Sequence, residues 1–196
     1  MRAIEIKKDI YWVGAIDWEL RNFHGYLTQR GSTYNAYLIM DEKITLVDTV
    51  KPGALLTSQL LKRVSEIVDP AKIDYVISNH TEMDHSGTLP EIMKIAKNAE
   101  LVVSPNGEKG LKAHYKTDFN FKVVKSGDSL NLGKRTLQFY LTPMVHWPDN
   151  MINYIPEDKL LFTNDSFGQH YASAERFDDE APFEIVMDEA CKYYAN

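Results

Sequence analysis

The sequence predicts an α/β fold in which layers of strands and helices pack as a sandwich. Strand pairs come first along the chain, then a helix and two strand–helix units, and then strands again. A doubly wound sheet would alternate strands and helices throughout, so this order of elements favours a sandwich. With 196 residues, 44% of them apolar, the chain is long enough for one sizeable domain, to which we assign residues 1–196.

Three strands are expected before residue 50. The segments at 10–14, 34–39 and 44–48 are rich in β-branched and aromatic residues, which favour strands. Residues 41–43, between the second and third segments, have the length and polarity of a hairpin turn. These two segments should therefore pair as an antiparallel hairpin.

The middle of the chain predicts helices that alternate with strands. A helix should run from Pro52 to about Val68, because apolar residues recur there at three- and four-residue intervals and mark one buried face. The further elements expected in this part are strands at 73–79 and 101–103 and helices at 89–97 and 107–114.

Strands return in the last third. They are expected between 121 and 141, at 151–155 and at 160–162. A final helix should begin near Pro182 and continue to Asn196, because no stop signal precedes the chain end.

Composition excludes several classes of function. A net charge of −6 argues against nonspecific nucleic-acid binding, which relies on a basic surface. The single cysteine, Cys191, excludes an internal disulfide and a cysteine-based zinc or iron–sulfur cluster within one chain. No apolar run is long enough to cross a bilayer, and no signal pattern opens the chain. We therefore expect a soluble cytoplasmic protein without membrane partners.

Four potential metal ligands lie within six residues, directly after the strand expected at 73–79. They are His80, Glu82, Asp84 and His85. Sites in α/β proteins form where strands end, and Gly87 allows the backbone to bend tightly beyond the segment. Mixed nitrogen and oxygen donors suit zinc, iron or manganese, and two carboxylates favour iron and manganese. Two other interpretations are a polar surface loop and a metal-free proton-transfer site.

Two more donors also follow expected strands. His146 closes an apolar segment and precedes Pro148, which stops the strand, and Asp165 follows the strand at 160–162. Taken singly, these residues could be a solvated histidine and a capping aspartate. Together with His80, they predict strand-end donors that meet at the same edge of a sheet.

With these donors, the chain resembles proteins of the metallo-β-lactamase fold and, among them, the flavodiiron proteins. The general fold carries the pattern H-x-H-x-D-H, whereas Glu82 replaces the second histidine here, as is typical of flavodiiron proteins. Other segments similar to that family lie at 33–38, 146–149, 164–170 and 188–196. The resemblance implies an αβ/βα sandwich and covers nearly the whole chain.

The resemblance also implies a role for each donor. His80, Glu82 and His146 would bind one iron, Asp84 and His85 would bind a second, and Asp165 would bridge both. It further suggests that His24 and Tyr193 lie near the oxygen-binding pocket as supporting residues. A packed or surface position for His24, and a place on the buried face of its helix for Tyr193, are the alternatives.

By the same resemblance, the reaction is the reduction of dioxygen to water or of nitric oxide to nitrous oxide. Electrons would come from a rubredoxin-like donor through FMN in a C-terminal flavodoxin-like domain. That domain would meet the iron site of the partner subunit in a head-to-tail homodimer.

The chain departs from the family pattern at its end. It stops at Asn196, before the family's last iron-binding histidine and the flavodoxin-like domain, and it contains no glycine-rich phosphate cradle. We therefore expect a fold that is incomplete at the C-terminal end, and little or no turnover by this chain alone. The alternatives are a binuclear metallohydrolase of the same fold, against which Glu82 argues, and an inactive remnant or binding module.

Overall fold

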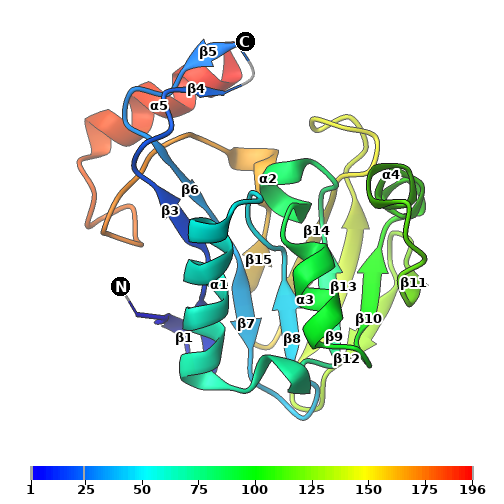
Figure 1. The fold of residues 1–196 in the computed structure, drawn as a ribbon. Coiled ribbons are helices and arrows are strands. Elements are labelled where there is room, and N and C mark those ends of the chain that lie inside the picture. Colours follow the sequence, from blue (N-terminus) through cyan, green and yellow to red (C-terminus); the bar gives the residue numbers. More distant parts are fainter. Residues whose placement is uncertain (1, 24, 196) are drawn as a thin grey trace.

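Two β-sheets packed face to face form the centre of the molecule, and helices cover the outer face of the larger sheet (Figure 1). The computed structural model describes residues 2–23 and 25–195. The α/β sandwich predicted from the order of elements is confirmed. Within the described residues, no helix combines the length and apolar character that a membrane crossing requires.

The larger sheet has seven strands in the order β1-β2-β7-β8-β9-β10-β11. Its strands are β1 (Ile4–Lys7), β2 (Ile10–Trp12), β7 (Tyr37–Ile39), β8 (Thr45–Val47), β9 (Tyr75–Ser78), β10 (Glu100–Val103) and β11 (Phe121–Val123). The strands from β1 to β8 pair antiparallel, and β7 and β8 form the predicted hairpin. From β8 to β11 the pairing is parallel, because helices make each crossover between these strands.

The helices that make these crossovers lie on one face of the seven-stranded sheet (Figure 1). The helical elements are α1 (Ala54–Ile67), the 3₁₀ turn η1 (Pro70–Lys72), α2 (Met83–Ser86), α3 (Leu89–Ile95), α4 (Pro105–Tyr115), the 3₁₀ turn η2 (Asn164–Phe167) and α5 (Phe183–Tyr194). Leu56, Leu60 and Val64 of α1 are buried against the sheet, as the helical spacing predicts. The helix expected at 107–114 begins earlier, at Pro105, because the hydroxyl of Ser104 accepts a hydrogen bond from the Gly107 amide and caps it.

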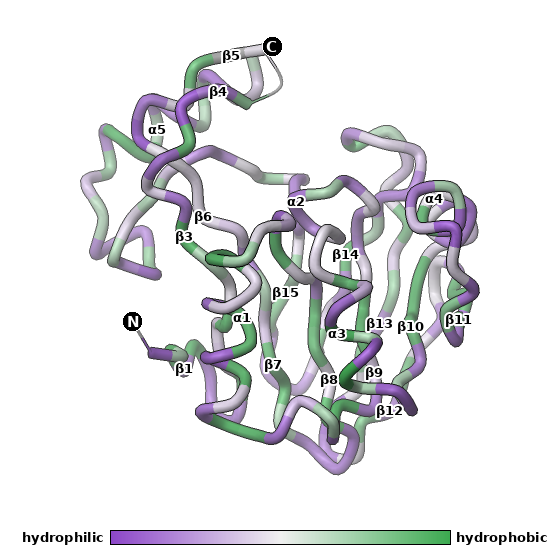
Figure 2. The backbone as a smooth tube through the Cα atoms, viewed as in Figure 1, coloured by the Kyte–Doolittle hydropathy of each residue, from purple (hydrophilic) through white to green (hydrophobic). Residues whose placement is uncertain are grey.

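The second sheet has four antiparallel strands in the order β12-β13-β14-β15. They are β12 (Ser129–Asn131), β13 (Thr136–Leu141), β14 (Met151–Ile155) and β15 (Leu160–Phe162). Successive residues of a strand face opposite sides, so Val76 of β9 packs under the helices while Ile77 packs against Phe139 in the layer between the sheets. The strands are rich in hydrophobic residues, and the connecting loops are largely hydrophilic (Figure 2).

The strand predicted at 10–14 ends at Trp12, and the strand predicted at 34–39 is broken in two. Beyond Trp12 and before Tyr37 the chain leaves the main sheet, and β3 (Ala15–Asp17) pairs with β6 (Ser32–Tyr34) as a separate ribbon. The ribbon can form because Gly14 has no side chain: a Cβ there would lie 2.0 Å from the Tyr34 carbonyl oxygen. A further short hairpin joins β4 (Asn22–Phe23) to β5 (Tyr26–Leu27), next to α5 (Figure 1).

Candidate metal centre

The four donors of the His80–His85 segment lie where β9 ends and α2 begins. His80 follows β9 after one residue, whereas Asp84 and His85 belong to α2, a single helical turn that the sequence predicted as loop. The side chain of His80 is fully buried, and Glu82 and Asp84 are each 6% exposed. This burial rules out the polar surface loop, because solvated side chains would remain accessible.

The other two donors come from the second sheet. His146 lies in the loop between β13 and β14, and Asp165 lies in η2, directly after β15. The expectation that all these strand ends share the edge of one sheet is wrong. The strands β12 to β15 are joined by short antiparallel connections and form a sheet of their own, so the donors meet across the end of the sandwich.

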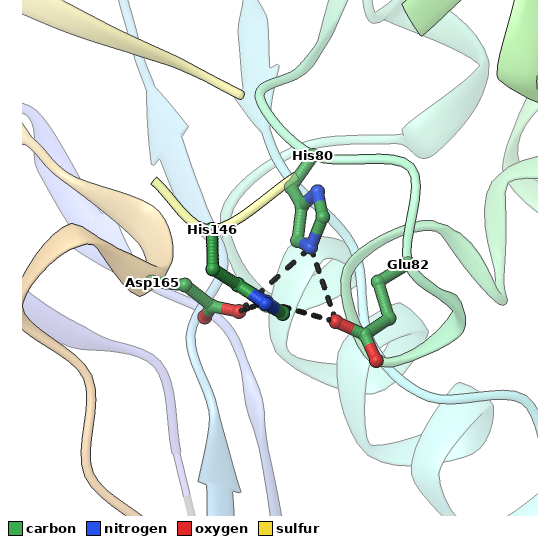
Figure 3. Close-up of side chains that lie close together, drawn as sticks. All are labelled: His80, Glu82, His146 and Asp165. Atoms are coloured by element: carbon green, nitrogen blue, oxygen red, sulfur yellow. Dashed lines mark hydrogen bonds and ion pairs between the residues drawn. The ribbon is translucent and has the colours of Figure 1, made fainter. Parts of the chain in front are cut away.

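Four donors converge in the first of two clusters (Figure 3). Glu82 Oε2 lies 3.1 Å from His80 Nε2 and 3.2 Å from His146 Nε2. Asp165 Oδ2 lies 3.2 Å from His146 Nε2 and 3.8 Å from His80 Nε2. Donors that share one ion at about 2.1 Å stand roughly 3.0–3.5 Å apart, so this spacing fits a single transition-metal ion.

The second cluster consists of Asp84, His85 and Asp165. His85 Nε2 lies 2.8 Å from Asp165 Oδ1 and 3.6 Å from Asp84 Oδ2. Asp165 therefore presents a different oxygen to each cluster. A carboxylate in this arrangement can bridge two cations that each bind one of its oxygens.

The charges of the site, like the distances between its donors, favour bound cations. Hydrogen bonds to Asp165 and Glu82 raise the pKa of His146 to about 10. Burial alone would lower the pKa of His85, but the charges of Asp165 and Asp84 outweigh it and raise that pKa well above its ordinary value. Three carboxylates thus gather where only protonated imidazoles or metal ions can balance them.

Asp84 supplies a further observation in favour of a metal. Its Oδ1 atom is buried and has no hydrogen-bond partner among the described residues. A buried carboxylate oxygen without a partner is costly, and a bound cation would satisfy it. Nitrogen and carboxylate donors, with no sulfur among them, fit iron, manganese or zinc better than an all-oxygen metal.

Two aspartates that the sequence did not single out hold the loop that carries His80. Asp48, at the end of β8, accepts hydrogen bonds from the backbone N–H and the side-chain amide of Asn79, at 2.8 and 3.0 Å. Asp149 accepts hydrogen bonds from the ring of His80 and the amide of Thr81. The available signal was their position: each carboxylate follows an apolar segment, as the candidate ligands do.

A pocket of about 190 Å³ opens beside the second cluster. Asp84, His85 and Asp165 line it, together with Tyr193 of α5. The Tyr193 hydroxyl lies 3.5 Å from the backbone carbonyl oxygen of Asp165, and its ring lies against that of His170. Tyr193 is thus next to the donors, as predicted, and its role in the pocket stays a prediction. The prediction for His24 lies outside the described residues.

The fold and the paired clusters agree with a match to a family model. Residues 33–192 match the model described as ODP family beta lactamase. The chain belongs to this family. The ODP-family match spans the elements that carry all six donors, and it confirms the metallo-β-lactamase-like fold expected from the sequence.

Relatives of this ODP-family chain are flavodiiron proteins, which confirms the resemblance. The chain is 50% identical over 198 residues to the nitric oxide reductase of Moorella thermoacetica, across 100% of this chain and 49% of the relative. The solved structure of rubredoxin oxygen:oxidoreductase from Desulfovibrio gigas has a TM-score of 0.95 and 44% identity, across 100% of this chain and 49% of that one. The solved structure of the flavodiiron protein from Giardia intestinalis has a TM-score of 0.95 and 40% identity, across 100% of this chain and 48% of that one. The ODP-family chain spans about half the length of the curated relatives it matches.

Proposed function

We propose that residues 1–196 form the di-iron domain of a flavodiiron oxidoreductase that reduces dioxygen to water, nitric oxide to nitrous oxide, or both. The observation that supports this most directly is Asp165, which turns one oxygen to each of two donor clusters. Names of the relatives point to the same chemistry, since one is a nitric oxide reductase and another an oxygen reductase.

In this proposal each donor has a specific place. His80, Glu82 and His146 would hold one iron, Asp84 and His85 would hold the other, and Asp165, which belongs to both donor clusters, would contribute to each. When bound, the two irons supply electrons and open coordination positions to the substrate gas. The carboxylates compensate the charge of two divalent ions, which a shell of neutral imidazoles alone would leave more cationic.

The chain's own residues shape access to this centre. The second cluster opens on the pocket beside α5, whereas His80 is fully buried. A small gas would therefore arrive from the side of Asp84 and His85, between the donors and the ring of Tyr193. His146, which is 46% exposed, lies on the side open to an electron donor.

Both reactions need more electrons than the protein side chains provide. Dioxygen takes four electrons and four protons to form two water molecules, and two nitric oxides take two electrons and two protons to form nitrous oxide and water. We propose that FMN, bound by a flavodoxin-like domain outside these 196 residues, delivers them in a head-to-tail homodimer. A rubredoxin-like protein would reduce the FMN, by analogy with the rubredoxin oxygen:oxidoreductase of Desulfovibrio gigas.

Metal analysis is the first test. The chain should be expressed with iron and zinc both available, purified without chelator, and analysed for metal content. Two irons per chain are expected. Stoichiometric zinc together with hydrolysis of esters or thioesters would overturn the redox function in favour of the hydrolase.

Turnover is the second test. The 196-residue chain alone should consume dioxygen or nitric oxide slowly at most when NADH and a flavin reductase are supplied. Adding a flavodoxin-like domain from a flavodiiron relative should raise the rate. A fast flavin-dependent rate by the chain alone would contradict the proposal that a separate flavodoxin-like domain delivers the electrons. If the added domain gives no rate either, the chain is better explained as an inactive remnant.

A further inference from the structure

One oxygen atom of Asp149 holds both the ring of His80 and the backbone that follows it. Asp149 Oδ2 lies 3.0 Å from His80 Nδ1 and accepts a hydrogen bond of 2.7 Å from the Thr81 amide. Asp149 is 5% exposed, so water competes little for these contacts. The contacts reach from the loop between β13 and β14 to the end of β9, and they join the two sheets at the metal centre.

This contact determines which nitrogen of His80 is available to a metal. An ionised carboxylate only accepts hydrogen bonds, so Nδ1 must carry the proton that it shares with Asp149. The lone pair of the neutral ring then sits on Nε2, which faces Glu82 at 3.1 Å and Asp165 at 3.8 Å. A carboxylate behind a ligating histidine also makes the ring a more basic ligand.

The backbone of Asp149 is itself held by hydrogen bonds from the start of α4. The hydroxyl of Ser104, which caps this helix, donates a hydrogen bond of 2.7 Å to the Asp149 carbonyl oxygen. The side-chain amide of Asn106 donates to the Pro148 carbonyl oxygen at 3.1 Å. The aspartate is therefore held by the protein scaffold, whether or not a metal is bound.

The contacts of Asp149 favour one cluster over the other. Its side chain contacts His80 and Thr81, which belong to the first cluster and its loop. Asp84 and His85 sit on α2, where the His85 carbonyl oxygen accepts a hydrogen bond from the Thr49 amide, on the β8 side. The two clusters thus have different supports.

We propose that Asp149 is a positioning residue for the first metal site, which sets the tautomer and direction of His80 before the ion binds. The inference rests on the proposed metal centre, but not on the identity of the metal or of the substrate gas. Loss of Asp149 should weaken binding at the His80, Glu82 and His146 site more than at the Asp84 and His85 site.

The test is an anaerobic titration of the metal-free 196-residue chain with Co²⁺, whose visible absorption reports the ligands of each site. In D149A, affinity at the first site should fall by about 10- to 100-fold, the usual effect of losing such a partner. D149N should lose less, because an amide oxygen still accepts both hydrogen bonds although it lacks the charge. The absorption band of the first site should also shift in both variants.

The matched control is D74N, which changes a carboxylate just before β9, at the end of that strand far from His80. Asp74 accepts hydrogen bonds from the Ile44 amide at 2.9 Å and from Lys43 at 3.1 Å. This variant should lower the melting temperature of the metal-free chain and leave both Co²⁺ affinities and the spectrum unchanged.

The outcomes separate the inference from the proposed function. If the wild-type chain binds no Co²⁺, the proposed metal centre fails, and this inference fails with it. If the wild type binds two ions and both sites of D149A and D149N weaken equally, or neither site does, the inference alone is overturned. D149N keeps the test decisive should D149A fail to fold.

Discussion

His85 and Asp165 lie 2.8 Å apart, Nε2 to Oδ1, although one side chain comes from the helical turn after β9 and the other from the turn after β15. The second oxygen of Asp165 faces His146 at 3.2 Å. Each sheet thus supplies part of both clusters, and the Asp165 carboxylate is their common member.

The shared carboxylate makes Asp165 the most sensitive donor. We expect D165A to reduce bound metal from two ions per chain to less than one, because it removes a ligand from both clusters. Metal content by mass spectrometry after dialysis measures this. The control is D118N, since the side chain of Asp118 is 91% exposed and pairs only loosely with Lys112, at 3.6 Å. Retention of two tightly bound ions in D165A would show that Asp165 does not bridge.

Glu82 should determine which metal the first site prefers. Its carboxylate lies within 3.2 Å of two imidazoles, and E82H would replace it with a third. A site richer in nitrogen favours zinc over iron, so the ratio of zinc to iron should rise in protein expressed with both metals. An unchanged ratio of zinc to iron in E82H would show that Glu82 does not determine the metal preference.

Metal removal should lower thermal stability. The donors form a metal site only in the native state, so an ion would bind the folded chain and not the unfolded one. At a hundredfold excess over its dissociation constant, such an ion stabilises the fold by roughly 3 kcal/mol. For a chain of this size, chelation should lower the melting temperature by about 5–10 °C. In D165A the difference between loaded and chelated protein should shrink, and a full difference there would contradict the assigned site.

Asp48 should matter for stability independently of metal. It is 4% exposed, has a φ of 56° and satisfies two donors of Asn79. D48A leaves both donors unsatisfied and forces alanine into the left-handed region, at a cost of about 3 kcal/mol. D48N should cost about 1 kcal/mol, because asparagine tolerates that φ and can still accept one bond. Urea unfolding of the chelated chain measures both, and equal losses would argue against this account.

Glu189 should control how firmly α5 is attached. It is 2% exposed, and its two oxygens bind Arg30 at 3.0 Å and Lys192 at 2.7 Å. E189Q keeps the shape but removes the charge, so the amides of α5 should exchange hydrogen faster than in the wild type, while those of β9 should not. The exposed Glu184 on the same helix provides the control, E184Q. Equal exchange in both variants would mean that the ion pairs do not hold the helix.

Local patterns predicted the elements whose signals are local. Hydrophobic periodicity and turn composition predicted the buried face of α1, the hairpin of β7 and β8, and the strands β14 and β15. The donor segment at 80–85 could be found in the same way, because its ligands are close in sequence. The more distant donors, His146 and Asp165, were indicated by their positions after expected strands, and the resemblance to flavodiiron proteins then implied their roles.

Features that depend on the docking of separate segments could not be predicted. The break between Tyr34 and Tyr37 exists because another strand bends at Gly14, and no pattern within 34–39 encodes that. The contact between Asp149 and His80 joins residues 69 positions apart, in loops that adjoin strands of different sheets. Its geometry follows from how the two sheets pack, which sequence spacing does not specify.

The origin of the donors in two sheets has a consequence for assembly of the protein. His80 to His85 can gather as soon as β9 and α2 form, but His146 and Asp165 reach them only when the last hairpin has closed over the core. A nascent chain would thus offer an ion only an incomplete and weakly binding set of ligands. The complete set of donors exists only once both sheets have packed, so in the proposed centre an ion would bind tightly to the folded structure and would not direct its formation.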